Sequence, residues 1–96
     1  MAGVGAAAPG ADDNASGAAG VLELARVLAA TPMRHDLRLV LFGGEDQGLF
    51  GSQAHVAALA PADSPRITMV VNMDMIGRLN TSPPSVLLEG VRSHAR

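Results

Sequence analysis

Two kinds of apolar segment alternate along the chain, and the first kind has the spacing of a helix. From Ala18 to Ala30 apolar residues dominate, and only Glu23 and Arg26 interrupt them, three positions apart on one helix face. This pattern predicts a mostly buried helix. A second helix is expected to begin around Ser52, after a turn rich in glycine, and to end before Pro61.

The second kind of segment is a short apolar run without helical spacing. Leu37–Phe42 and Ile67–Met73 are apolar at most positions, which is typical of parallel strands that are buried on both faces. Val86–Leu88 is a candidate third strand. Strands that alternate with helices indicate an α/β fold with right-handed crossovers.

Composition narrows the classes of function. The chain has 96 residues and a net charge of −2, and it contains no cysteine. It therefore lacks the basic surface of a nucleic-acid-binding domain and cannot form disulfides or thiolate metal sites. No apolar stretch approaches the roughly 20 residues of a membrane span. Residues 1–10, rich in glycine and alanine, are expected to be flexible and do not resemble a signal peptide. Localisation and oligomeric state stay open.

Acidic residues follow the ends of the predicted strands and precede the first predicted helix. Asp12 and Asp13 lie before the helix, Glu45 and Asp46 follow the first strand, and Asp74 ends the second. Because the carboxyl ends of parallel strands meet at one edge of a sheet, the strand-end acids are expected to converge there. The two residues before the helix could join them. Clustered carboxylates repel one another unless a cation lies between them, so the pattern indicates a divalent metal.

Each acidic site also has a structural interpretation when it is taken alone. Asp12 or Asp13 could cap the first helix, a frequent role for aspartate. Glu45 and Asp46 could be a solvated loop pair. Asp74 is harder to explain in this way, because it would be buried and unpaired among apolar residues. The joint pattern therefore favours a metal site.

The acidic residues lie in three motifs, which are Pro9–Gly17 (PGADDNASG), Phe42–Ser52 (FGGEDQGLFGS) and Asn72–Gly77 (NMDMIG). In sequence, order and spacing they resemble motifs of the zinc aminopeptidases of metallopeptidase family 28, in clan MH. The resemblance covers about Pro9 to Asn80. It implies an α/β/α sandwich with a mainly parallel central sheet, of which residues 11–96 would be an incomplete part, a partial catalytic domain of a zinc peptidase.

The resemblance also implies a role for four carboxylates. Asp13 would bridge two zinc ions, Asp46 and Asp74 would each bind one of them, and Glu45 would be the general base. Two zinc ions about 3.5–4 Å apart activate water and polarise a peptide carbonyl, while a carboxylate that is not a ligand moves the proton. The implied activity is hydrolysis of N-terminal peptide bonds. A cis peptide bond between Asp13 and Asn14 is implied as well.

Two features depart from the family pattern. Asp46 stands where the family usually has glutamate, which shortens the side chain by one methylene. The two histidine ligands of the family, one upstream of the first motif and one far downstream, have no counterpart here, so the isolated chain is expected to be an inactive fragment. His35, His55 and His94 are interpreted as surface or packing residues.

Other functions stay open. A glutaminyl-cyclase-like acyl transferase would use one zinc ion, and the retained set of four carboxylates slightly favours two. A non-catalytic peptidase-like binding domain, such as that of the transferrin receptor, would be expected to have lost ligands, whereas the acidic residues persist here. A stand-alone chain without activity is a further alternative, which the flanking genomic sequence would distinguish from a fragment.

Overall fold

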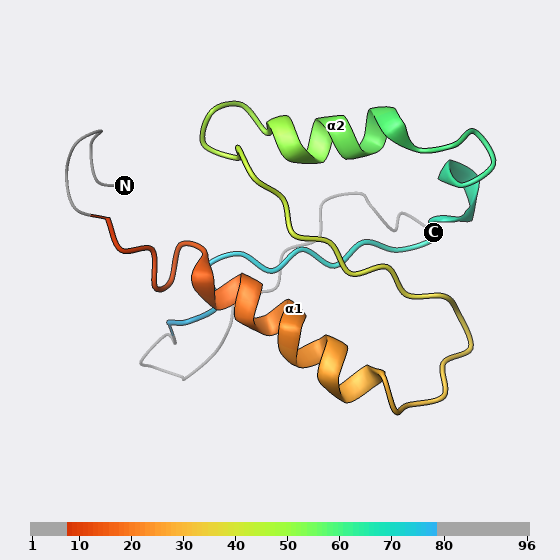
Figure 1. Cartoon of the computed structure of the whole chain (residues 1–96), viewed down its shortest axis with the longest axis horizontal. Helices are drawn as coiled ribbons and strands as arrows, with labels where there is room; N and C mark the ends of the chain where they lie inside the picture. Colours follow the sequence, from red (N-terminus) through yellow and green to blue (C-terminus); the bar gives the residue numbers. More distant parts are fainter. Residues whose placement is uncertain (1–7, 79–96) are drawn as a thin grey trace. The chain divides into compact units, whose positions relative to one another are not determined.

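The computed structural model describes residues 8–78 and contains two α-helices and one short 3-10 helix in that range. They are α1 (Ala15–Leu28), α2 (Phe50–Ala58) and η1 (Ser64–Arg66) (Figure 1). The chain divides into two compact units. Of the described residues, unit 1 comprises 8–36 and 73–78, and unit 2 comprises 37–72.

Helix α1 of unit 1 confirms the first predicted helix, and it begins three residues earlier than Ala18. Asn14 is its N-cap, and the Asn14 side chain accepts a hydrogen bond from the Gly17 amide. After the last turn, the Thr31 hydroxyl donates to the Val27 carbonyl oxygen at 2.9 Å. The expected burial is not observed within the described residues, where Leu22 is 64% exposed.

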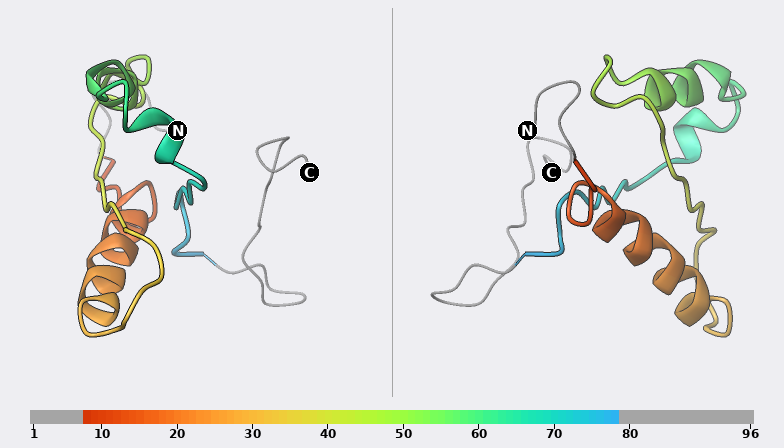
Figure 2. Two further views of the ribbon diagram at one scale, coloured as in Figure 1. Left: turned by 90° about the vertical axis from the view of Figure 1, so that its right-hand side faces the viewer. Right: turned by 60° about the vertical axis from the view of Figure 1, so that its left-hand side comes forward.

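Helix α2 of unit 2 confirms the second predicted helix and begins two residues before Ser52. It has no side-chain N-cap, and the residue before it, Leu49, has a left-handed backbone with φ of 60°. Figure 2 shows α2 from two further sides, with the loop that precedes it. Within residues 8–78, no helix has both the length and the apolarity that a membrane span requires.

The predicted α/β fold was wrong for the part of the chain that the structure describes. Residues 8–78 contain helices but no strand, and therefore no parallel sheet and no α/β/α sandwich. A strand exists only through hydrogen bonds to a neighbouring strand. Within unit 2, which contains Leu37–Phe42 and all of Ile67–Met73 except Met73, no backbone hydrogen bond joins the two predicted strand segments. The third candidate, Val86–Leu88, lies outside the described residues.

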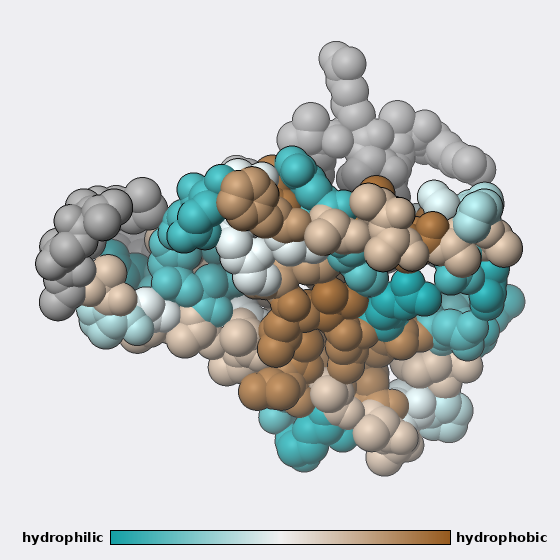
Figure 3. Space-filling model, turned by 45° about the horizontal axis from the view of Figure 1, so that its top comes forward, coloured by the Kyte–Doolittle hydropathy of each residue, from teal (hydrophilic) through white to brown (hydrophobic). Residues whose placement is uncertain are grey.

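The apolar side chains of these segments lie open to solvent. Met69, Val70 and Val71 are 65%, 75% and 68% exposed, and no hydrophobic residue in the described range is buried. Figure 3 shows apolar residues, in brown, open on the face that it draws. The sequence pattern thus identifies side chains suited to burial, but residues 8–78 supply no surface that covers them.

Candidate metal centre

The four predicted site residues are divided equally between the two units. Asp13 and Asp74 belong to unit 1, whereas Glu45 and Asp46 belong to unit 2. All four are exposed. Among residues 8–78, no group of three or more histidine, aspartate or glutamate side chains is placed to hold a metal ion. The convergence of the four carboxylates therefore stays a prediction.

In unit 1, Asp13 lies in a short loop that leads directly into α1. The Ala15 amide donates to the Gly10 carbonyl oxygen at 3.0 Å, and this bond closes the loop around Asp13. The peptide bond between Asp13 and Asn14 is cis, which confirms that prediction. Within the described residues, the Asp13 carboxylate has no hydrogen bond or ion pair.

Asn14 connects this loop to the segment that carries Asp74. Its Nδ2 donates to the Met73 carbonyl oxygen at 3.0 Å, and its Oδ1 accepts from the Met75 amide at 3.1 Å. The same Oδ1 accepts from the Gly17 amide at 3.0 Å. One side chain thus caps α1 and holds the backbone on both sides of Asp74.

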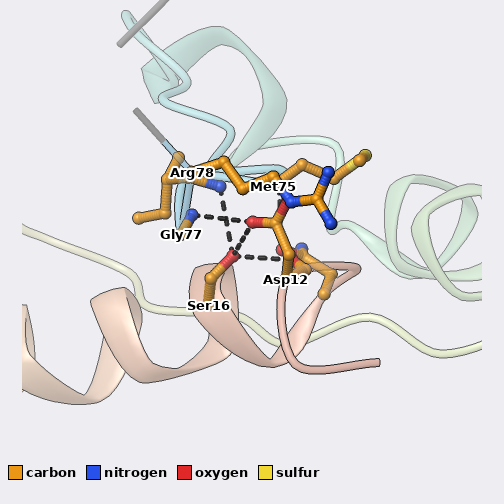
Figure 4. Close-up of polar contacts among 7 residues, drawn as sticks. Asp12, Ser16, Met75, Gly77 and Arg78 are labelled. Atoms are coloured by element: carbon orange, nitrogen blue, oxygen red, sulfur yellow. Dashed lines mark hydrogen bonds and ion pairs between the residues drawn. The ribbon is translucent and has the colours of Figure 1, made fainter. Parts of the chain in front are cut away.

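Ser16 and Asp12 continue this connection toward Arg78 (Figure 4). The Ser16 hydroxyl donates to the Asp12 carbonyl oxygen at 2.6 Å and accepts from the Ile76 amide at 3.1 Å. One Asp12 carboxylate oxygen accepts from the Gly77 amide at 2.7 Å, and the other lies 3.9 Å from Arg78 Nε. Asp12 therefore fixes the loop and neither caps α1 nor offers an open carboxylate.

A glycine permits the close approach between the two segments of unit 1. Gly17 is buried. A Cβ atom at this position would lie 2.5 Å from Asn14 Oδ1 and closer still to the Met73 carbonyl oxygen. Any larger residue would therefore push the segment that carries Asp74 away from the start of α1.

In unit 2, Glu45 and Asp46 lie in a tight turn that leads into α2. The amides of Gly48 and Leu49 donate to the Glu45 carbonyl oxygen at 3.1 and 2.9 Å. Below the turn, the Gly51 amide donates to the Gly43 carbonyl oxygen at 3.0 Å. The general base and the zinc ligand implied by the resemblance are thus adjacent residues of one closed loop.

The histidines of the described range lie outside these carboxylate loops. The His55 ring packs edge-on against Phe42 with ring centroids 5.5 Å apart, which confirms that it is a packing residue. His35 is exposed. His94 lies outside the described residues.

The exposed carboxylates suit a zinc ion as part of a mixed set of ligands. Aspartate oxygen is a common zinc ligand, most often together with histidine nitrogen. Asp13, Asp46 and Asp74 are exposed, and none has a hydrogen bond or ion pair within residues 8–78. Because their lone pairs are available, these three residues fit the role of metal ligands.

Asn14 and Ser16 are the residues that sequence reasoning missed. Both are residue types that favour helix N-termini, and they stand just before an apolar helical run, so this signal was present. Their hydrogen bonds to residues 73–76 could not be predicted from local sequence, because about 60 residues separate the partners. The hydrogen bond between Asn14 and Met75, for example, spans 61 positions.

Comparison with known proteins identifies the family. The family model of peptidase family M28 matches residues 2–95. The chain is 42% identical over 69 residues to aminopeptidase YwaD of Bacillus subtilis, covering 72% of this chain and 15% of the relative. It is 42% identical over 72 residues to an aminopeptidase of Pseudomonas aeruginosa, covering 75% of this chain and 13% of the relative.

A fungal relative is named as a metalloprotease. A probable zinc metalloprotease of Leptosphaeria maculans is 40% identical over 70 residues, which is 73% of this chain and 16% of the relative. The chain thus spans only a small part of the length of these relatives. No solved structure matches it. The resemblance of the three motifs is confirmed, and the chain belongs to peptidase family M28.

Proposed function

We propose that the whole protein is an aminopeptidase that hydrolyses the N-terminal peptide bond of peptides with two zinc ions, and that residues 11–96 are part of its catalytic domain. The observation that carries the proposal is the connection in unit 1. Asp13 and Asp74, the two ligands that the resemblance implies there, have open carboxylates and are joined through Asn14. The names of the relatives, aminopeptidase and probable zinc metalloprotease, support it.

Each carboxylate has a distinct part in this proposal. Asp13 would bridge the two zinc ions, and Asp46 and Asp74 would each bind one of them. When bound, the zinc ions supply Lewis acidity toward water and the peptide carbonyl. Glu45 takes the proton from the attacking water and passes it to the leaving amine. The tight turn that contains Glu45 and Asp46 supports this proposal, because it would keep the proposed base next to a proposed ligand.

N-terminal specificity and metal dependence are tested together. The whole protein should hydrolyse aminoacyl chromogenic substrates and leave the same substrates intact when their amino group is acetylated. A chelator should abolish turnover, and added zinc should restore it. Cleavage of the acetylated substrates would contradict an aminopeptidase, and turnover that resists chelation would contradict a metallopeptidase.

A further inference from the structure

We infer that Asn14 is a positioning residue of the metal centre, and that its side-chain carboxamide sets the placement of Asp74 relative to Asp13. The inference rests on the proposed function, because it concerns the two carboxylates that are proposed as zinc ligands in unit 1. Asn14 itself touches neither the substrate nor a metal in this account. It acts through the backbone that carries the two ligands.

The Asn14 carboxamide makes the kind of hydrogen bonds to the backbone around Asp74 that a neighbouring strand makes in a sheet. Asn14 Nδ2 donates to the carbonyl oxygen of the residue before Asp74, and Oδ1 accepts from the amide of the residue after it. A backbone residue in a sheet likewise uses one donor and one acceptor toward its neighbour strand. Both peptide groups of Asp74 are thereby held by a single side chain, while the Asp74 carboxylate stays exposed.

The residue that carries this side chain is joined by a peptide bond to the other proposed ligand, Asp13. Asn14 follows Asp13 directly in the loop that the Ala15–Gly10 hydrogen bond closes. The other hydrogen bonds and the ion pair between the segments, made by Ser16 and Asp12, reach residues 76–78, which lie beyond Asp74. Loss of the carboxamide would therefore release the backbone at Asp74 while the rest of the segment stays docked on α1.

Helix capping is the competing explanation for Asn14, and the two roles use different atoms. The cap needs only an acceptor for the Gly17 amide at 3.0 Å. The tether also needs Nδ2 and the full length of the side chain. Serine caps helices about as well as asparagine, but its hydroxyl is one bond shorter and cannot bridge the Met73 carbonyl and the Met75 amide. The Asn14→Ser variant therefore keeps the cap and removes the tether.

The experiment compares Asn14→Ser, Asn14→Ala and wild type in the whole protein. Zinc affinity is measured by chelator competition, and amide hydrogen exchange at Met75 is measured on the metal-free protein. The Asn14→Ser variant should lose less Tm than Asn14→Ala, because it keeps the cap. It should bind zinc roughly 10–100-fold more weakly, the usual range for residues that orient ligands, and exchange the Met75 amide faster. Asn14→Ala should show the same zinc loss and a lower Tm.

Thr31→Ala is the matched control, because it removes one side-chain hydrogen bond at the other end of α1. It should leave zinc affinity and Met75 exchange unchanged. Zinc affinity of Asn14→Ser equal to wild type, or unchanged exchange at Met75, would overturn the positioning role and leave Asn14 as a cap. A wild-type protein that takes up no zinc would contradict the proposed function, and this inference with it.

Discussion

Three consecutive side chains, Asp12, Asp13 and Asn14, have three different environments. The Asp12 carboxylate accepts from the Gly77 amide and lies near Arg78, so its oxygens are occupied. The Asp13 carboxylate is exposed. Asn14 caps α1 and holds the residues that flank Asp74. This division agrees with the proposal that Asp13, the second of the two adjacent aspartates, binds metal and that Asp12 does not.

Replacement of Glu45 by glutamine tests whether Glu45 is the general base. Because Glu45 is proposed to move a proton and not to bind zinc, Glu45→Gln should keep the zinc content and lower kcat by roughly 10²–10⁴-fold. Asp13→Ala should instead lose zinc. Asp63→Asn is a control of the same chemical type, since Asp63 lies 3.7 Å from Arg66 in an exposed pair and has no proposed role. Unchanged turnover in Glu45→Gln would refute the assignment.

Two glycines on either side of the Glu45 turn, Gly43 before it and Gly51 in the first turn of α2, should tolerate substitution differently. A Cβ at Gly51 would lie 2.9 Å from Gly43 N and closer to its carbonyl oxygen, whereas a Cβ at Gly43 meets nothing within 4 Å. Gly51→Ala should therefore lower the free energy of unfolding by roughly 1–3 kcal/mol and reduce turnover. Gly43→Ala should change the free energy of unfolding by less than about 1 kcal/mol. Chemical denaturation measures the free energy of unfolding of both variants. Equal values for the two variants would contradict the close approach of Gly51 to Gly43.

At the scale of elements, local signals could be read from the sequence and nonlocal ones could not. The periods and flanking turn residues of α1 and α2 lie within each helix, so both helices were predicted to within a few residues. The strand prediction failed because a strand depends on a partner that the described residues do not supply. The acidic positions were found through three local motifs, whereas the bond from Asn14 to Met75 spans 61 positions.

The ion pair on α1 gives a prediction about pH. Arg26 Nε donates to Glu23 at 2.9 Å, and this hydrogen bond lowers the pKa of the Glu23 carboxyl. A lowered pKa means that the pair stabilises the helix above the usual pKa of glutamate, and that this contribution is lost as the pH falls through the lowered value. In Arg26→Gln, a carboxyl NMR titration should show the Glu23 pKa rising toward its usual value. An unchanged titration would mean that the pair does not form in solution.

At the scale of the whole molecule, the exposed apolar residues predict how the 96-residue chain behaves alone. No hydrophobic residue of the described range is buried, and open apolar surface of this kind favours association. The family resemblance also implies that the 96-residue chain has three oxygen ligands and no histidine ligand. Such a set suits zinc less well than a mixture of oxygen and nitrogen ligands. Expressed alone, the chain should aggregate and bind little zinc. A soluble monomer with stoichiometric zinc and peptidase activity would contradict this expectation.

We propose that Asp13, Asp46 and Asp74 bind a pair of zinc ions in the whole protein. Anomalous diffraction at the zinc edge, from crystals of the whole protein grown with zinc, tests it most directly. We expect two peaks about 3.5–4 Å apart, with the Asp13 carboxylate bridging them, Asp46 at one peak and Asp74 at the other. A single peak, or zinc bound away from Asp13, would contradict the account.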